Sequence, residues 1–402
     1  MMNSMKDLNI DQRQVSIQFE RQDKLYHSGE QIRGSVVLEL EKPMEITGVE
    51  VKLYGGTSVR WTDNRDPIPD DKVNIEYNVE EIYFKKVLVL WGRGRVHHPR
   101  NHDDKEVDKL SAGKHVFPFR YNLPTDIPCS FEGIYGSVRY YAKASVLSEL
   151  YSQNLESTVF ITVLQDLNLS LQSLSGVRKS QEISIHSCFR AGSLTCTLSL
   201  PSCGFVPGQI IRADISVKNK STRKVQGATL SLKQIVRYGS DDSNKSRKVM
   251  WEIQHLNIGS INAESEQKFV ENILHVPSLP PSRLDCCQFI DIKYDMVVSA
   301  LCKSHPLLLS LPIIIGTLPH GQCASNWEYK EQFPYPGTKW RSIEVDGTRL
   351  EDDEHGFIPA YKYYHSAASC KYQILDNSPS SKRKHLHLNN EHCSDIESET
   401  TV

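Results

Sequence analysis

The sequence predicts an all-β protein with two tandem antiparallel β-sandwich domains and a disordered tail. Three observations support this prediction. Apolar and polar residues alternate along most of the chain, which is the pattern of half-buried strands. A block near the N-terminus recurs in the second half of the chain, and the alternation ends near residue 319. Together these observations predict domains at 15–165 and 185–318, a connector at 166–184 and a tail at 319–402.

A turn-and-strand segment at residues 26–37 is repeated at 205–216. In each copy an aromatic residue precedes a glycine, and a strand with apolar residues at every second position follows. One constant offset carries Gly29 onto Gly208. A spacing of roughly 180 residues is too long for a solenoid repeat and indicates two whole domains. The other matched pairs are Tyr26 and Phe205, Ile32 and Ile211, Arg33 and Arg212, Leu53 and Leu232, and, at a shorter offset, Tyr140 and Tyr294.

Within the first copy, the alternation predicts short strands separated by turn residues. Val15, Ile17 and Phe19 share one face of the first strand. Residues 91–104 are rich in Gly, Arg and His, so we expect a loop there. Strands at intervals of roughly ten residues, with turns between them, indicate an antiparallel sandwich. The remaining expected strands cover 32–40, 49–53, 73–79, 87–91, 117–123, 138–146 and 159–163.

The second copy has its clearest strand at Ile290–Ala300, where Ile, Tyr and Met residues alternate with charged ones. The most apolar run of the chain, Leu307–Ile315, is about half the length of a membrane-spanning helix and contains Pro312, so we expect a buried strand. Residues 166–184 show no clear period, which favours a connector. After 319 an acidic run and a basic run replace the alternation, and such a segment buries too little apolar surface to offset its ordering.

Bulk properties favour a cytosolic protein. Its 402 residues exceed the size at which a single core stops growing. The net charge of −2 gives no global attraction to nucleic acid, and residues 1–14 lack the apolar stretch of a signal peptide. The ten cysteines form no C-x-x-C pair, so we expect reduced thiols rather than a zinc site or a disulfide framework. We expect no metal, no cofactor and only peripheral membrane association.

Several segments of both copies carry a family resemblance through their order and spacing. They are Gly29–Gly34, Gly113–Phe119, Leu123–Pro124, Gly136–Tyr141, Pro207–Ile210 and Val217–Ser221. With them the chain resembles the α-arrestins, the arrestin domain-containing proteins. The resemblance implies two arrestin-like, immunoglobulin-type β-sandwiches joined by a short hinge, without a catalytic centre. It also implies an adaptor that binds cytosolic parts of membrane receptors or transporters and links them to endocytic, ubiquitin-ligase or PDZ-scaffold machinery. A retromer-type arrestin-fold coat subunit of endosomal sorting is the alternative.

The chain departs from the family at one motif. Family members commonly carry Pro-Pro-x-Tyr after the second sandwich, and Nedd4-type WW domains bind that motif. Here the corresponding segments are Asn326–Tyr329 and Ile358–Tyr361, and neither has the paired prolines that preform the extended helix a WW groove reads. Direct recruitment of a Nedd4-type ubiquitin ligase is therefore in doubt.

Two short motifs stand in the predicted tail. Thr400 and Val402 supply the hydroxyl, apolar side chain and free carboxylate of a PDZ-domain ligand, which adds as a strand to the domain edge. Tyr372 and Leu375 fit the Tyr-x-x-apolar pattern that clathrin adaptors bind in extended form. The alternative for each is an incidental match, since both patterns are short.

Basic residues of the first copy are the candidate cargo site. Lys85 and Lys86 lie on a predicted strand, and Arg93, Arg95 and Arg100 follow in the loop. In arrestin-like proteins, cationic residues of the first domain meet phosphorylated or acidic receptor tails, and the guanidinium fork suits phosphate. A solvated basic loop is the competing interpretation.

The other charged clusters give weaker indications of function, and enzyme motifs are absent from the sequence. Lys218, Lys220, Arg223 and Lys224 surround a turn of the second copy and suit either anionic lipid or plain solvation. The histidines within 97–102 match no metal-ligand spacing. Gly-x-Ser-x-Gly, Walker and His-Glu-x-x-His motifs do not occur, so we do not expect an enzyme.

Overall fold

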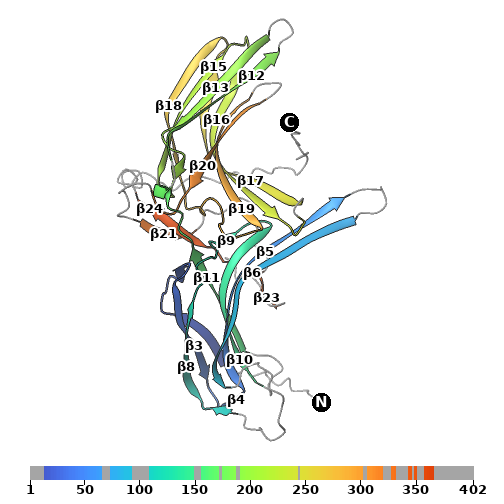
Figure 1. Ribbon diagram of the computed structural model, residues 1–402, viewed down its shortest axis with the longest axis vertical. Coiled ribbons are helices and arrows are strands. Elements are labelled where there is room, and N and C mark those ends of the chain that lie inside the picture. Colours follow the sequence, from blue (N-terminus) through green and yellow to red (C-terminus); the bar gives the residue numbers. More distant parts are fainter. Residues whose placement is uncertain are drawn as a thin grey trace, which may run out of the picture. The chain divides into compact units, whose positions relative to one another are not determined.

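The protein is described by a computed structural model, in which nearly every regular element is a β-strand (Figure 1). Among the described residues only η1 (Leu169–Leu171) is helical, and it is a short 3-10 turn. The first 365 residues form one compact unit. The structure describes residues 13–65, 73–92, 108–148, 155–171, 174–186, 191–242, 245–301, 306–319, 327–331, 343–345, 348–350 and 357–365.

The first sandwich pairs a three-stranded sheet, β1-β3-β8, with a larger sheet in the order β2-β11-β10-β5-β6. Strand β9 adds to β10, and β4 pairs with β7. Every pairing is antiparallel except that of β2 with β11. The strands are β1 (Arg13–Phe19), β2 (Leu25–His27), β3 (Gln31–Leu40), β4 (Met44–Ile46), β5 (Gly48–Arg65), β6 (Val73–Gly92), β7 (Asp108–Leu110), β8 (Gly113–Asn122), β9 (Phe131–Glu132), β10 (Gly136–Leu147) and β11 (Leu155–Leu164).

The second sandwich repeats this plan, with a fourth strand in its smaller sheet. Its sheets are β12-β13-β15-β18 and β14-β20-β19-β16-β17, and β14 runs parallel to β20 as β2 does to β11. The strands are β12 (Val177–His186), β13 (Ala191–Leu200), β14 (Gly204–Phe205), β15 (Ile210–Asn219), β16 (Val225–Gly239), β17 (Ser246–Ile261), β18 (Ser265–His275), β19 (Ile290–Ala300) and β20 (Leu307–Ile315). The prediction of two tandem β-sandwiches is confirmed.

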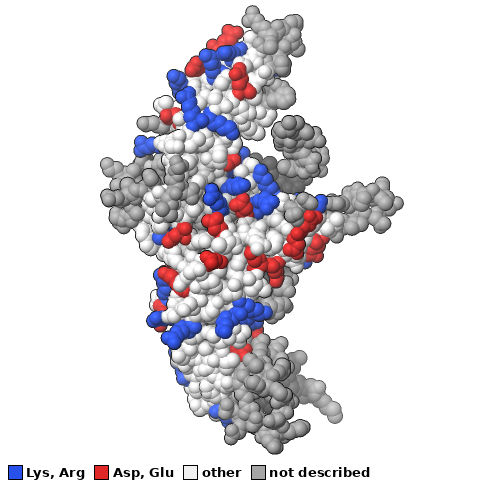
Figure 2. All heavy atoms as spheres, in the orientation of Figure 1, with Lys and Arg blue, Asp and Glu red and all other residues white. Residues whose placement is uncertain are grey.

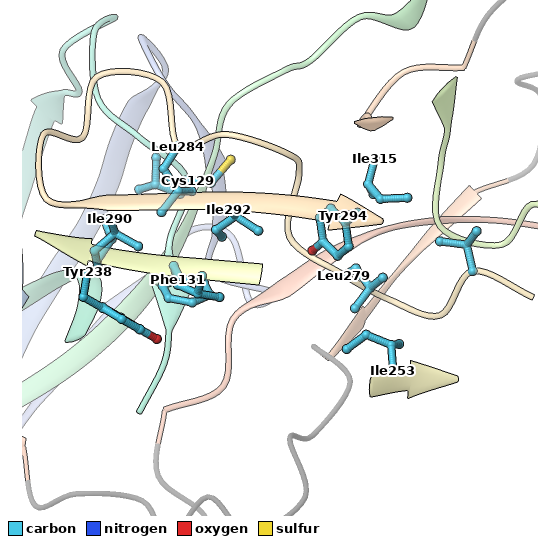
Figure 3. Packing of buried hydrophobic residues seen from close by; sticks show 14 of the residues in the cluster. Cys129, Phe131, Tyr238, Ile253, Leu279, Leu284, Ile290, Ile292, Tyr294 and Ile315 are labelled. Atoms are coloured by element: carbon cyan, nitrogen blue, oxygen red, sulfur yellow. The ribbon is translucent and has the colours of Figure 1, made fainter. Parts of the chain in front are cut away.

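The core lies between the two sheets of each sandwich, where the predicted apolar faces meet. Ile290 and Ile292 of β19 are buried, as the alternation predicts. The cluster continues from one sandwich into the other, because Cys129 and Phe131 of the first belong to it together with Leu284 of the second (Figure 3). Each such fully buried side chain contributes about 1.5–3 kcal/mol relative to exposure.

The repeated glycines occupy matching turns. Gly29 has φ +82° and Gly208 has φ +91°, a backbone conformation that residues other than glycine rarely adopt. The N–H of Gly29 donates to the carbonyl of Pro124 at 3.0 Å, and that of Gly208 donates to the carbonyl of Val276 at 2.7 Å. The internal repeat read from the sequence therefore corresponds to a repeated backbone geometry.

The repeated tyrosines also make the same bond in both copies. The buried hydroxyl of Tyr140 donates to the carbonyl of Pro128 at 2.7 Å, and that of Tyr294 donates to the carbonyl of Pro280 at 2.8 Å. Each bond fixes the approach to a long central strand, β10 or β19. A buried carbonyl without such a donor would carry a desolvation penalty.

The structure differs from the predicted connector at 166–184. Residues 177–186 form β12, which pairs with β13 over its whole length. One face of this edge strand is exposed and the other is only half-buried, with Val177 and Ile183 packed against the core, so its apolar alternation is weak. Backbone pairing, which periodicity does not report, orders the segment.

Part of the predicted disordered tail at 319–402 forms strands, whereas residues 366–402 lie outside the described residues. Strand β21 (Trp327–Glu331) pairs antiparallel with β24 (Ala360–Tyr364), and β22 (Ile343–Val345) pairs with β23 (Thr348–Leu350). Tyr361 and Tyr364 are buried. Isolated anchors of this kind escape a search for periodic patterns, because five residues are too few to show a period.

Removing single tyrosine hydroxyls tests the repeated bond. Tyr140→Phe and Tyr294→Phe should each lower the free energy of unfolding by about 1–3 kcal/mol, because each leaves a buried carbonyl unpaired. Tyr26→Phe is the matched control, since the buried Tyr26 hydroxyl has no hydrogen-bond partner among the described residues. Urea denaturation should show no loss for Tyr26→Phe, and an equal loss for all three would contradict the prediction.

Candidate functional site

An aromatic stripe crosses the outer side of the larger sheet in the first sandwich. Tyr54 of β5, Tyr141 of β10 and Phe160 of β11 are direct neighbours in register. The Tyr54 and Tyr141 rings stack at 4.9 Å, and Phe160 meets Tyr141 edge-on at 5.8 Å. Leu53, one residue before Tyr54, is buried in the core. Because successive residues on a strand point to opposite faces, these three rings point away from the core.

Lysines surround this stripe. Lys52 places its Nζ 5.6 Å from the ring centre of Tyr54 and 5.8 Å from that of Tyr141. Lys143 pairs with Glu156 at 2.8 Å. Lys85 of β6 stands directly opposite Tyr54, so its side chain shares that face. The surface formed by Lys52, Tyr54, Lys85, Tyr141, Lys143 and Phe160 is called the aromatic face below.

Exposed apolar side chains of β6 extend the aromatic face. Val87 and Val89 are 46% and 43% exposed. They stand opposite Lys52 and Glu50 in register, which places them on the same side of the sheet as Lys85. An outward face that combines stacked rings, lysines and open valines fits a ligand with both apolar and acidic groups.

The structure separates the predicted cargo residues. Lys85 lies on the aromatic face, whereas Lys86 stands opposite the buried Leu53 and so points from the other side of β6. Both lysines are exposed. Arg93, Arg95 and Arg100 lie outside the described residues. Figure 2 shows patches of Lys and Arg side chains on both sandwiches and acidic side chains along the β5–β6 arm, where β6 carries Glu76, Glu80 and Glu81.

The chain's own C-terminal part reaches the aromatic face. The ring of Phe357 stacks on that of Phe160, with centroids 5.3 Å apart and planes 26° apart. From Phe357 the chain enters β24, which pairs with β21. Residues 327–331 and 357–365 together are called the strap.

Two tyrosines anchor the strap to both sandwiches. The hydroxyl of Tyr361, only 2% exposed, donates to the carbonyl of Ser130 in the first sandwich at 2.7 Å. The hydroxyl of Tyr364 donates to the carbonyl of Thr317, after the last strand of the second, at 2.7 Å. Burial raises the pKa of Tyr364 to about 12, so its hydroxyl stays protonated and able to donate at neutral pH.

Gly208 makes room for the strap. The N–H of Tyr364 donates to the carbonyl of Pro207 at 2.9 Å. A Cβ on Gly208 would stand 1.9 Å from the carbonyl oxygen of Tyr364, which is far inside contact distance. Ser278 of the second sandwich donates through its hydroxyl to the carbonyl of Lys330 in β21 at 2.9 Å. The repeated glycine turn of the second sandwich is thus also the seat of the strap.

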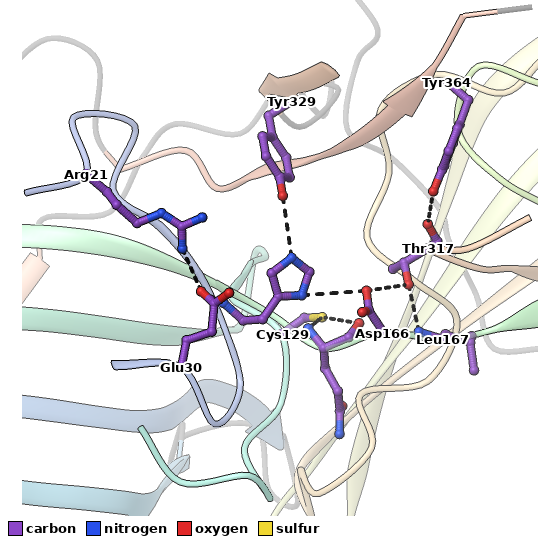
Figure 4. Close-up of polar contacts among 10 residues, drawn as sticks. Arg21, Glu30, Cys129, Asp166, Leu167, Thr317, Tyr329 and Tyr364 are labelled. Atoms are coloured by element: carbon purple, nitrogen blue, oxygen red, sulfur yellow. Dashed lines mark hydrogen bonds and ion pairs between the residues drawn. The ribbon is translucent and has the colours of Figure 1, made fainter. Parts of the chain in front are cut away.

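A polar network underlies the strap where the two sandwiches meet (Figure 4). Asp166 lies 3.6 Å from Nδ1 of His27 and accepts the hydroxyl of Thr317 at 3.3 Å. The N–H of Leu167 donates to Oγ1 of Thr317 at 2.7 Å. On its other side, Nε2 of His27 lies 3.4 Å from the hydroxyl of Tyr329 in β21. The network therefore joins the first sandwich, the connector, the second sandwich and the strap.

Glu30 borders this network as a charged group. Partial burial, the strongest single influence, would raise the pKa of Glu30. The N–H of His27 at 2.9 Å and the guanidinium of Arg21 at 2.6 Å together outweigh it and hold that pKa below its ordinary value. The Glu30 carboxylate is therefore ionised at neutral pH and fixes Arg21 at the edge of the junction.

A second basic surface lies on the outer side of the three-stranded sheet. An open groove of about 610 Å³ there is lined in part by Phe19, Arg33, Pro118 and Arg120. Arg33 and Arg120 are opposite each other in register. This groove offers two guanidinium groups beside apolar surface, and nothing of the described chain occupies it.

The remaining predicted sites are distributed as follows. Thr400, Val402, Tyr372 and Leu375 lie outside the described residues. Tyr361, which ends one of the two segments lacking paired prolines, is buried in the strap. Sequence reasoning missed the aromatic face, and its only signal was aromatic residues at outward positions of predicted strands.

The described residues contain no group of three His, Cys, Asp or Glu side chains arranged to hold a metal ion. Within the same part of the chain, no helix has the length and apolarity to cross a membrane.

The duplicated sandwiches define a two-domain β-scaffold, and family models identify it. The arrestin (or S-antigen) N-terminal domain matches residues 15–170, and the arrestin (or S-antigen) C-terminal domain matches residues 190–320. The chain belongs to the arrestin family, in its α-arrestin branch of arrestin domain-containing proteins. Members of this family are generally non-catalytic adaptors.

Curated relatives agree with this assignment. The chain is 27% identical to arrestin domain-containing protein 17 of Caenorhabditis elegans over 312 residues, which are 75% of this chain and 70% of the relative. It is 27% identical to arrestin domain-containing protein 1 of Mus musculus over 306 residues, 74% of this chain. It is 26% identical to mouse arrestin domain-containing protein 4 over 76% of this chain and 72% of the relative. The chain spans less than two thirds of mouse protein 1, at 63%.

Matched glycine substitutions test the seat of the strap. Gly208→Ala and Gly29→Ala both force alanine into positive φ, at a cost of about 1–2 kcal/mol each. Only the Gly208 variant also collides with Tyr364. Hydrogen exchange followed by mass spectrometry should therefore show faster exchange at 360–364 in Gly208→Ala than in Gly29→Ala. Equal exchange there in both variants would show that the strap does not depend on this seat.

Proposed function

We propose that this protein is an α-arrestin adaptor that binds cytosolic parts of membrane receptors or transporters and links them to endocytic or PDZ-scaffold machinery. The family assignment supports the adaptor role, and the aromatic face is the single observation that carries cargo binding. It offers lysine and aromatic side chains on an outward sheet surface, which suits an extended acidic or phosphorylated segment.

Within this proposal, the basic loop recognises cargo and the tail recruits partner proteins. Lys85 on the aromatic face acts with Arg93, Arg95 and Arg100 of the following loop in cargo recognition. Thr400 and Val402 recruit a PDZ domain, and the Tyr372–Leu375 motif recruits a clathrin adaptor. These roles rest on sequence chemistry alone.

Ubiquitin-ligase recruitment is the weakest element of the family pattern here. Neither segment that replaces Pro-Pro-x-Tyr has paired prolines, and Tyr361 donates its hydroxyl inside the strap. The proposal therefore includes no direct recruitment of a Nedd4-type ubiquitin ligase through that motif. We propose a cytoplasmic protein with peripheral recruitment to the plasma membrane and endosomes, which regulates signalling and transport without a cofactor.

Proximity labelling in cells tests the adaptor role. With the full chain fused to a biotin ligase, we expect labelled receptors or transporters and endosomal proteins at the plasma membrane and endosomes. The same fusion ending at His365 keeps the compact unit and should retain cargo while losing the tail partners. A fixed-ratio complex with coat proteins, without labelled cargo, would instead support the retromer-type alternative.

The C-terminal motif has a separate test. One glycine added after Val402 moves the free carboxylate away from the apolar side chain, so pulldown of PDZ domains by the full chain should fall to background. Tyr372→Ala is the matched control in the same tail and should leave PDZ pulldown unchanged. Undiminished pulldown by the extended chain would remove the PDZ assignment.

A further inference from the structure

Two adjacent cysteines lie on a turn of the second sandwich that meets the first. Cys286 is exposed, whereas Cys287 is half-buried and packs against the main core. Cysteine is among the residue types that are most often buried, so a thiol open to solvent is unusual. An exposed thiol with a second thiol beside it is an arrangement found in redox-sensitive sites, because the second thiol resolves the oxidised form of the first.

The backbone of this turn has a conformation that glycine usually supplies. The N–H of Cys287 donates to the carbonyl of Leu284 at 2.9 Å, which closes a β-turn with Cys286 at its third position. Cys286 has φ +70° there. Turns with positive φ at that position favour Gly or Asn, because a residue with a Cβ is strained there. The chain therefore presents a thiol where glycine would carry less backbone strain.

Cys287 is a contact through which the turn reaches the first sandwich. Its Sγ lies 3.4 Å from Oγ1 of Thr57 in β5, a residue that is only 1% exposed. Thr57 in turn bonds with the hydroxyl of Tyr83 in β6. Beside this contact, the N–H of Gln288 donates to the carboxylate of Glu81 at 3.1 Å. A movement of the Cys287 side chain therefore changes the contact of the turn with β5 and β6.

The other described cysteines lack this arrangement. Cys129 and Cys196 are buried, and burial raises the pKa of each thiol to about 12, so both stay protonated at neutral pH. Peroxides react with the thiolate rather than the thiol. Cys203 is half-buried and has no cysteine beside it in the chain. Among the described cysteines, an exposed thiol next to a second thiol occurs only at 286–287.

We propose that Cys286 and Cys287 form a peroxide-sensitive modification site, and that its oxidation loosens the contact between the two sandwiches. The Cys286 thiolate attacks hydrogen peroxide, so that its sulfur takes one oxygen as a sulfenic acid and the other oxygen leaves as hydroxide. The Cys287 thiolate then attacks that sulfur, and a second hydroxide leaves as the S–S bond forms. The two thiol protons convert both hydroxides to water, so two thiols and one peroxide give one disulfide and two waters.

The disulfide requires the Cys287 side chain to turn outward. In the reduced protein Cys286 lies in solvent and Cys287 lies on the core. To reach Cys286, the sulfur of Cys287 leaves Thr57 and the packing around it, and the vacated space destabilises the contact. A thiol reductant breaks the S–S bond and returns the turn to its first state. This inference goes beyond the proposed adaptor function and does not depend on it.

Peptide mapping of the full-length protein tests the modification. Reduced protein is treated with hydrogen peroxide, blocked with N-ethylmaleimide in denaturant and digested with trypsin. Cleavage after Arg283 and Lys293 yields a peptide, 284–293, whose only cysteines are Cys286 and Cys287. We expect this peptide to lose both maleimide adducts and to be about 2 Da lighter than its dithiol form. Dithiothreitol added before blocking should restore both adducts.

Two serine variants serve as matched controls. Cys286→Ser removes the exposed thiol, so oxidation of the remaining thiol in peptide 284–293 should fall about 10-fold or more. Cys203→Ser replaces a half-buried thiol of the same sandwich and should leave the disulfide yield within about 2-fold of the parent. Because Cys286 is exposed, serine at this position should keep the thermal melt of the parent, which excludes misfolding as the cause of the loss.

Hydrogen exchange followed by mass spectrometry tests the loosening. The N–H groups of Cys287 and Gln288 are bonded in the reduced protein. In the oxidised parent, exchange at 284–289 should become about 5-fold faster or more, and dithiothreitol should reverse the change. Cys286→Ser treated with peroxide should exchange there as the untreated variant does.

Three results would overturn the inference. Full maleimide labelling of peptide 284–293 after peroxide, while other cysteines of the chain oxidise, would show that the pair is not a modification site. Sulfinic acid at Cys286 without a disulfide would show that Cys287 does not resolve it. A disulfide with unchanged exchange at 284–289 would remove the effect on the contact between the sandwiches. The adaptor role is tested separately by proximity labelling and stands or falls without these results.

Discussion

Leu53 and Ala142 lie in the core of the first sandwich, and their burial forces Tyr54 and Tyr141 to the outside of the same sheet. Strand alternation makes this unavoidable, because neighbouring side chains point to opposite faces. A shift of one residue in register would exchange the two sets and expose the core residues. The position of the aromatic face is therefore fixed by the core behind it.

The two sandwiches share a plan but have different surroundings. Gly29 and Gly208 occupy equivalent turns with the same backbone conformation. Only Gly208 is covered by the strap. The carbonyl oxygen of Tyr364 lies so close to it that a residue with a Cβ would not fit there. The turn glycine present in both copies thus has a second role in one of them. The duplication supplies the scaffold, and the strap makes the copies unequal.

The strap also connects features that the sequence keeps apart. It runs from Phe357 on the aromatic face, through Tyr361 in the first sandwich, to Tyr364 beside the second. The polar network around Asp166 meets it through His27 and Tyr329. One short segment, the strap, therefore contacts both the aromatic face and the junction of the two sandwiches.

The amino-acid sequence alone predicts the fold class, the duplication and most strands, because alternation over long strands and a repeat over whole domains are strong signals. It placed Lys85 and Lys86 next to each other, which on a strand means opposite faces, and only the register between β5 and β6 decided that Lys85 is the one beside Tyr54. It gave no sign of β12, whose order comes from pairing with β13, nor of the strap, whose anchors are single buried tyrosines. Local pattern reports which face of a strand is apolar, but contacts between distant segments depend on how the sheets pack, and that is decided only in the tertiary structure.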